Sequence, residues 1–248
     1  MASRLLLPLA GLLLAVLGWA AGAVWLAHGM PIASAFAPLE SAASLWQLVS
    51  AGELWSHVVV SLKRVAVGLL LAILIGVPLG VLTGLSRRFM QATTPLFQFL
   101  RMVSPLSWMP LAVMVLGVGD APVYFLLAFA AVWPILLNTA SGVAQLDPNW
   151  LLLARSLSAT RTETVLRIVL PGITAQILTG VRLAIGIIWI VLVPAEMLGV
   201  SAGLGYFILD TRDRLAYSEL MAVIVLVGAL GYALDHLARA AHARWLHR

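Results

Sequence analysis

Long apolar segments separated by short polar ones are the feature that most constrains this chain. Of its 248 residues, 62% are hydrophobic and 10% are charged, whereas a soluble domain carries about 25% charged residues. One helical crossing of a bilayer needs about 20 apolar residues, and several segments reach that length. The sequence therefore predicts an all-α polytopic membrane protein in which residues 1–248 form a single transmembrane domain.

Six spans are expected, at residues 5–27, 61–85, 95–118, 121–143, 173–198 and 220–238. The first resembles a cleavable signal peptide, but its apolar run continues to Ala27 and favours an uncleaved span. Pro78 should kink the second span. Small residues in the second half of that span indicate close packing against a neighbouring helix; these are Gly76, Gly80 and Gly84.

Basic residues are unevenly distributed between the two sides of these spans. With the N-terminus inside the cell, nine arginines lie on the cytoplasmic side, namely Arg4, Arg87, Arg88, Arg155, Arg161, Arg167, Arg239, Arg244 and Arg248. Four basic residues lie on the opposite side, namely Lys63, Arg64, Arg212 and Arg214. Positive charge favours cytoplasmic loops, so both termini are expected in the cytoplasm. This pattern accounts for the net charge of +5 without a nucleic-acid partner.

The polar stretch at residues 147–171, between the fourth and fifth spans, is expected to be cytoplasmic. Asp147 is a suitable N-cap and Pro148 suits the first helical position, so a short helix is expected over residues 148–157. The helix is amphipathic and carries Arg155. These properties favour a docking surface over a pore.

A second short helix is expected after a joint at Ser158 and Ala159. Thr160 and Glu163 have the spacing of a capping box, which predicts a helix start. The helix should run toward Leu170, where the following Pro-Gly pair ends it. Residues 147–171 therefore read as two short helices hinged on small residues.

The same stretch resembles the cytoplasmic loop of binding-protein-dependent ABC import permeases, whose pattern is Glu-Ala-Ala-x3-Gly-x9-Ile-x-Leu-Pro. Ile168, Leu170 and Pro171 match its end, and Ala154 matches its second alanine. Two leucines replace the Glu and the first Ala, and Ser158 replaces the Gly. Further segments resemble the nitrate/sulfonate/taurine/bicarbonate branch of this family, namely residues 101–119, 133–143, 177–189 and 195–208. The resemblance as a whole covers residues 61–235.

The resemblance implies a permease subunit in a bacterial inner membrane, working by alternating access. Its expected partners are two ABC ATPase subunits, a second permease copy that favours a homodimer, and an external solute-binding protein. The implied cargo is a small anion, nitrate-, sulfonate/taurine- or bicarbonate-like, with a small heterocycle as an open alternative. The residues expected to couple the permease to the ATPase are Asp147, Trp150, Ala154, Arg155, Leu157, Ser158, Ala159, Thr160, Glu163 and Pro171.

No catalytic residue, cofactor or metal site is expected in this chain. It contains no cysteine, no His-Glu-x-x-His pair and no Gly-x4-Gly-Lys-Ser/Thr phosphate loop. ATP and magnesium would therefore be held by the partner ATPase. A membrane-embedded enzyme would need clustered acids or histidines at depth, and an ion-driven secondary transporter would show inverted repeats; neither pattern is found in the sequence.

Polar residues at membrane depth are candidates for the translocation path, since they are costly in lipid. They flank prolines that break the third and fourth spans, or stand alone in the fifth; they are Ser104, Ser107, Trp108, Asn138, Thr139 and Arg182. Hydrogen bonding between helices is the alternative role for the first five, and packing near the cytoplasmic mouth is the alternative for Arg182.

The glycine-containing loop at residues 199–216 is expected to face outward, where a binding protein would dock. Its candidate docking residues have mixed charge and are Asp210, Arg212, Asp213 and Arg214. A solvated loop with internal ion pairs is the alternative. Glu196, just before this loop, is expected to bond to the loop rather than to substrate.

Overall fold

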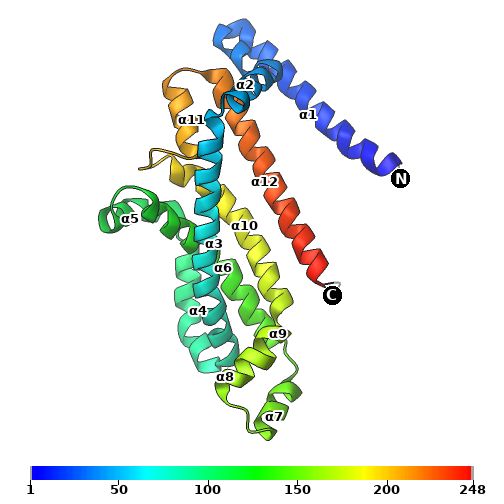
Figure 1. The fold of residues 1–248 in the computed structure, drawn as a ribbon, viewed down its shortest axis with the longest axis vertical. Helices are drawn as coiled ribbons and strands as arrows, with labels where there is room; N and C mark the ends of the chain where they lie inside the picture. The colour runs from blue at the N-terminus through cyan, green and yellow to red at the C-terminus, as the bar shows by residue number, and fades with distance from the viewer. Residues whose placement is uncertain (1, 247–248) are drawn as a thin grey trace.

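The computed structural model describes residues 2–246, which lie in helices and the turns that join them (Figure 1). Five helices are long and apolar enough to cross a membrane, namely α1 (Ala2–Gly29), α3 (Glu53–Leu85), α6 (Asp120–Ala144), α10 (Thr174–Glu196) and α12 (Tyr217–Leu246). A sixth candidate is broken, because α4 (Arg87–Met102) meets the pair η2 (Pro105–Trp108) and α5 (Met109–Leu116) at 90°. The prediction of an all-α polytopic membrane protein is confirmed.

The core of the bundle is the packing of α3 on α6, with α10 alongside (Figure 1). Gly68, Gly76, Gly80 and Gly84 repeat along α3 where it meets α6. A methyl group at Gly80 would lie 2.6 Å from Thr139 Cβ and 2.7 Å from the Leu136 carbonyl oxygen. The prediction that these small residues allow close approach is confirmed, and fully buried Leu126, Leu127, Ile135 and Ile188 fill the space around the contact.

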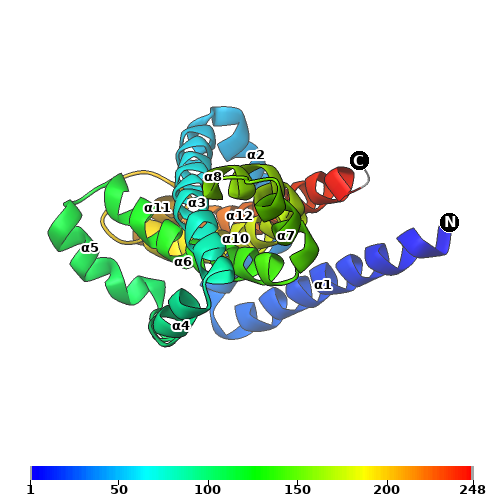
Figure 2. The same cartoon turned by 90° about the horizontal axis from the view of Figure 1, so that it is seen from below.

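The first helix stands apart from this core. Figure 2, seen from below, shows α1 extending away from the other helices. Its contacts are with η1 (Pro31–Phe36) and α2 (Pro38–Ala51), and its apolar side chains are largely exposed. By contrast α2 packs Leu48 against Val223 of α12 and Phe207 of α11 (Leu204–Asp213).

Three boundary predictions were wrong. The second span begins at Glu53 instead of Ser61, because the apolar run preceding Ser61 continues the helix; Arg64 is therefore mid-helix and buried rather than at a span end. The third span begins at Arg87 instead of Pro95, because the polar residues before Pro95 continue the helix; the expected break at its prolines is confirmed, since Pro105 follows the end of α4. The expected loop at residues 199–216 contains α11. Arg248, one of the arginines in the charge comparison, lies outside the described residues.

Replacing Gly80 with alanine should destabilise the fold, since the new methyl has no room between α3 and α6. Overpacking of this kind costs about 1–3 kcal/mol. The matched control is Gly186→Ala on α10, where nothing lies within 4 Å of the added group. Thermal unfolding of the purified protein in detergent should show a lower midpoint for Gly80→Ala alone; equal midpoints would contradict the close approach.

Candidate functional site

The end of the bundle shown at the bottom of Figure 1 carries the two short helices expected from the sequence. Helix α7 spans Pro148–Ser156. Asp147 caps it, because its Oδ1 accepts a hydrogen bond from the backbone N–H of Asn149 at 2.9 Å. The prediction of this helix and of its cap is confirmed.

The second helix, α8 (Arg161–Thr164), begins with a complete capping box. The backbone N–H of Thr160 donates to Glu163 Oε2 at 2.9 Å, and the N–H of Glu163 donates to Thr160 Oγ1 at 3.2 Å. The hydrogen bond from the Thr160 N–H holds the pKa of Glu163 below its usual value. The support that this carboxylate gives to the helix start is therefore present at neutral pH and lost only as the pH falls through that lowered pKa.

A π-helical turn, η3 (Val165–Val169), follows α8 and leads into α9 (Leu170–Gly172). The predicted helix does reach Leu170 and continues to Gly172, but the sequence did not indicate the π-helical turn within it. Single π-helical turns are frequent at functional sites. Val169 and Ile173, both fully buried, pack with Val81 of α3 and Val143 of α6. A displacement of the short helices would therefore be transmitted directly to the ends of two core spans.

The joint between α7 and α8 has left-handed backbone at Ser158, where φ is +55°. Glycine adopts this region without strain, whereas other residues do so at a cost of about 1–2 kcal/mol. Ala154 faces inward at 1% exposure, and its carbonyl accepts from the N–H of Ala159 at 2.9 Å. The joint thus needs a small buried residue at position 154 and favours glycine at position 158.

One face of α7 is apolar and uncovered. Trp150, Leu153 and Leu157 follow a spacing of three and four residues, which places them on the same side of the helix. Trp150 is 55% exposed and Leu157 is 73% exposed. Arg155, on the same helix, is also exposed. We call Trp150, Leu153 and Leu157 the α7 ridge.

Replacing Ser158 with glycine should raise the unfolding temperature, because it removes the left-handed strain at an exposed position. The expected gain is about 1 kcal/mol. Ser158→Val should lower stability, since a β-branched residue is disfavoured in this conformation. Thermal unfolding of both variants tests the left-handed conformation at position 158, and a valine variant as stable as the glycine variant would contradict that conformation.

The opposite end of the bundle holds a buried ion network centred on Arg64 of α3. Its Nη1 lies 2.7 Å from Glu196 Oε1, and its Nη2 lies 2.6 Å from Asp120 Oδ1. Nη1 also donates to the carbonyl of Ala202 at 2.6 Å. Glu196 is fully buried and Arg64 is 2% exposed. One guanidinium therefore joins α3, the start of α6 and the end of α10.

The same network fixes the N-terminus of α11. The backbone N–H of Gly205 donates to Glu196 Oε2 at 2.9 Å, and the N–H of Leu204 donates to Ser61 Oγ at 2.9 Å. The N–H of Gly203 donates to His57 Nδ1 at 3.1 Å. These contacts satisfy donors that a helix start leaves free. The prediction that Glu196 bonds to the segment after it is confirmed.

The candidate docking residues lie at the other end of α11. Asp210 pairs with Arg214 at 2.9 Å, and Arg212 pairs with Asp213 at 2.8 Å. Arg214 also reaches Glu219 at 3.3 Å. The structure therefore shows the internal ion pairs that were the alternative reading, and a docking role for these residues remains a prediction.

Replacing Arg64 with methionine should destabilise the protein strongly, because it leaves the buried Glu196 carboxylate without its cation. Breaking a buried pair from one side costs about 3–5 kcal/mol. Lys63→Met is the matched control, since the adjacent Lys63 is exposed. Unfolding temperatures of the two variants are compared, and similar values would show that the Arg64 network does not stabilise the fold.

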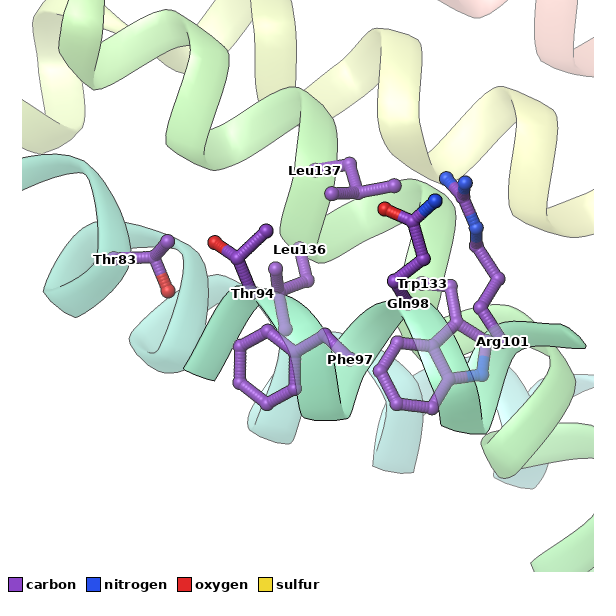
Figure 3. Close-up of a pocket in the computed structure, with 8 residues that line it drawn as sticks. All are labelled: Thr83, Thr94, Phe97, Gln98, Arg101, Trp133, Leu136 and Leu137. Carbon is purple, nitrogen blue, oxygen red and sulfur yellow. The ribbon is translucent and has the colours of Figure 1, made fainter. Parts of the chain in front are cut away.

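A groove lies on one side of the bundle, between α4, α6 and α10. It consists of two adjoining hollows of ≈ 70 Å³ and ≈ 440 Å³ that share Arg101, Trp133 and Leu137. In Figure 3 the side chains of Gln98 and Arg101 project from α4 to the same side, toward Leu137 of α6. We call this the Arg101 groove; its other lining residues are Thr83, Thr94, Phe97, Val103, Pro105, Ala130, Pro134, Leu136, Asn138, Leu183, Ile187 and Val191.

Of the six residues predicted for the translocation path, the structure brings only Asn138 to the groove, where its side chain donates to the Pro134 carbonyl at 2.8 Å. Thr139 is fully buried on the other side of α6, against Gly80. Trp108 packs on Phe129. The remaining three are exposed or half-buried and lie outside the groove lining; they are Ser104, Ser107 and Arg182.

Apart from Asn138, sequence reasoning missed the polar side chains that line this groove. Arg101 was assigned to an apolar third span, and Trp133 in the fourth span was given no role. The overlooked signal is the alternating spacing of four and three residues between polar positions on α4, from Arg87 to Arg101. That spacing keeps them on one face of a helix.

Residues 76–247 match the family described as Binding-protein-dependent transport system inner membrane component. The chain is 37% identical over 199 residues to the bicarbonate transport system permease protein CmpB of Synechococcus elongatus, covering 79% of this chain and 69% of that protein. It is 38% identical over 186 residues to the nitrate import permease protein NrtB of Leptolyngbya laminosa, covering 75% and 66%. The putative aliphatic sulfonates transport permease protein SsuC of Bacillus subtilis is 33% identical over 193 residues, covering 78% and 70%.

Among solved structures, the fold is similar to a chain of the MetNI methionine ABC transporter in an inward facing conformation. The TM-score is 0.59 at 16% identity, and the match covers 74% of this chain and 92% of that chain. At this identity the likeness concerns the fold alone.

Proposed function

Because this chain belongs to the family of binding-protein-dependent transport system inner membrane components, we propose that it carries a small inorganic or sulfonate anion and is driven through α7 and α8 by a separate ATPase. Membership makes the chain a permease subunit of a binding-protein-dependent ABC importer, with a transport role and no catalysis of its own. The alternative of an ion-driven secondary transporter is thereby rejected.

The observation that carries the coupling proposal is the hinged pair α7 and α8, packed on the spans at one face and uncovered at the other. Leu151 of α7 packs against the cluster in which Val169 of η3 and Ile173, both after α8, contact α3 and α6. The outer face of the pair presents the α7 ridge, of which Leu157 is 73% exposed. An ATPase subunit seated on the ridge would move α7, and η3 would carry that movement into α10. The coupling residues proposed from the sequence lie on or beside this pair.

The proposed orientation follows from charge. The polar segment between α6 and α10 carries Arg155, Arg161 and Arg167, and positive charge favours the cytoplasmic side. An ATPase would reach α7 from there, and both termini would lie on the same side. The α11 end would then face the external binding protein, with the buried Arg64 network holding α11 in place. ATP and magnesium would bind in the ATPase.

The proposed substrate class comes from the relatives. Proteins named for bicarbonate, nitrate and aliphatic sulfonates are each at least 33% identical to this chain. All three solutes are small anions that carry oxygen atoms. A second copy of this chain is proposed to complete the path, since the Arg101 groove is open on one side of the single bundle. A small heterocycle as cargo remains the competing proposal.

Removing the α7 ridge should uncouple transport from ATP hydrolysis. The double variant Trp150→Ala and Leu157→Ala is expected to weaken ATPase association by about tenfold or more, as the loss of central aromatic and apolar contacts does at interfaces. The control is Trp46→Ala, an exposed tryptophan on α2, a helix at the opposite end of the molecule from α7 (Figure 1). Affinity of detergent-purified permease for its ATPase subunits is measured together with uptake by proteoliposomes.

The double variant must keep the unfolding temperature of the unmodified protein, which separates lost docking from lost folding. Normal ATPase affinity and normal uptake in this variant would contradict the coupling proposal. Loss of both in the Trp46→Ala control would show that the assay reports general damage.

A further inference from the structure

A stripe of polar side chains runs along one face of α4. It consists of Arg87, Gln91, Thr94, Gln98 and Arg101, at successive spacings of four, three, four and three residues. This periodicity keeps all five on one side of a helix. All five are exposed in the single chain. We call them the α4 stripe.

The stripe is long enough to matter for crossing a membrane. Fourteen residues separate Arg87 from Arg101, and at helical rise they span about 21 Å, against about 30 Å for a hydrocarbon core. The opposite face of α4 is apolar and exposed, with Leu96 at 53% and Phe99 at 65%. That face suits lipid, whereas a polar face toward lipid is costly. The stripe must therefore face water or another protein surface.

The charges on this face are of one sign. No Asp or Glu is among the described residues that line the Arg101 groove. Within residues 2–246, neither Arg87 nor Arg101 takes part in an ion pair. The groove thus offers positive charge without a carboxylate to match it, beside the amide and hydroxyl groups of Gln98 and Thr94.

If a second copy of this chain packs here with the stripe on the two-fold axis, the stripe of one copy faces the same cationic stripe of its partner. Direct contact would then oppose like charges, which is unfavourable. A water-filled gap carrying an anion between the two stripes removes this conflict.

We propose that the α4 stripe lines an aqueous path through which the substrate anion passes, and that Arg101 makes this path selective for negative charge. The proposal deepens the proposed function and rests on it for the nature of the cargo. Gln91, Thr94 and Gln98 supply hydrogen-bonding side chains between the two arginines. Arg101 is a positioning residue for the anion and takes no part in any chemical step.

Thiol labelling tests water access and charge preference without knowledge of the substrate. The chain contains no cysteine, so Gln98→Cys and the lipid-face control Leu96→Cys each introduce a single reactive group. The permease assembled with its ATPase subunits in proteoliposomes is treated with an anionic or a cationic methanethiosulfonate, and labelling of this chain is followed by mass. Rates are divided by those of a free thiol in the same buffer.

Gln98→Cys is expected to react faster than Leu96→Cys and to favour the anionic reagent by about tenfold, as expected for opposite charges a few ångströms from a guanidinium. Adding Arg101→Gln should bring that preference close to unity, whereas Arg101→Lys should keep most of it. Arg88→Gln, which removes an exposed charge of α4 outside the stripe, should leave it unchanged. Unfolding temperatures confirm that each variant is folded.

Two results would overturn the proposal. Labelling of Gln98→Cys as slow as that of Leu96→Cys would show that protein or lipid covers the stripe. Fast labelling without an anionic preference would show a path that does not select charge. Uptake of labelled nitrate, bicarbonate and taurine is measured in parallel. If the unmodified complex transports none of the three, the proposed substrate fails while the labelling result still decides the stripe.

Discussion

The close approach of α3 to α6 is the constraint on which the rest of the structure depends. Without side chains at Gly76 and Gly80, the two backbones come near enough that an added methyl would collide with its neighbours. In lipid, where apolar surface is not expelled by water, such close packing is a main source of helix association. At one end of the pair this contact brings Val81 and Val143 together next to the short helices. At the other end it brings Arg64 close to Asp120.

The two ends of this rigid pair are built from opposite kinds of interaction. At the α11 end, a buried guanidinium and carboxylate fix three helices in one arrangement, because either charge left alone would be costly. At the α7 end, short helices meet at a strained residue and a π-helical turn, and the contacts to the spans are apolar. Close-packed apolar contacts transmit displacement, which suits an end that must pass movement to the spans. The ionic end suits a surface that must keep its shape.

The α4 helix adds a third kind of surface, polar and open. Three residues of its stripe, Thr94, Gln98 and Arg101, line the Arg101 groove (Figure 3). The break between α4 and α5 turns the chain by 90° just beyond Arg101. The proposed anion path is lined by α4 up to the break, and the apolar helix α5 lies beyond the break.

Local signals made much of this predictable from the sequence. The caps at Asp147 and Thr160, and the four unbroken spans after Glu53, follow from residue spacing and apolar length alone. The partners of Arg64 could not be found this way, because Glu196 lies 132 positions along the chain. For the same reason Thr139 was placed on the path although it faces α3. The α4 stripe was readable, but its meaning required the knowledge that α4 lines a groove.

A cryo-electron microscopy map of this permease, assembled with its ATPase subunits and held with a non-hydrolysable ATP analogue, tests the central claim most directly. The account predicts that Trp150 and Leu157 are buried against an ATPase surface and that the stripe from Arg87 to Arg101 faces a water-filled space between two copies of this chain. An α7 helix without ATPase contact, or a stripe packed against lipid or protein, would contradict it.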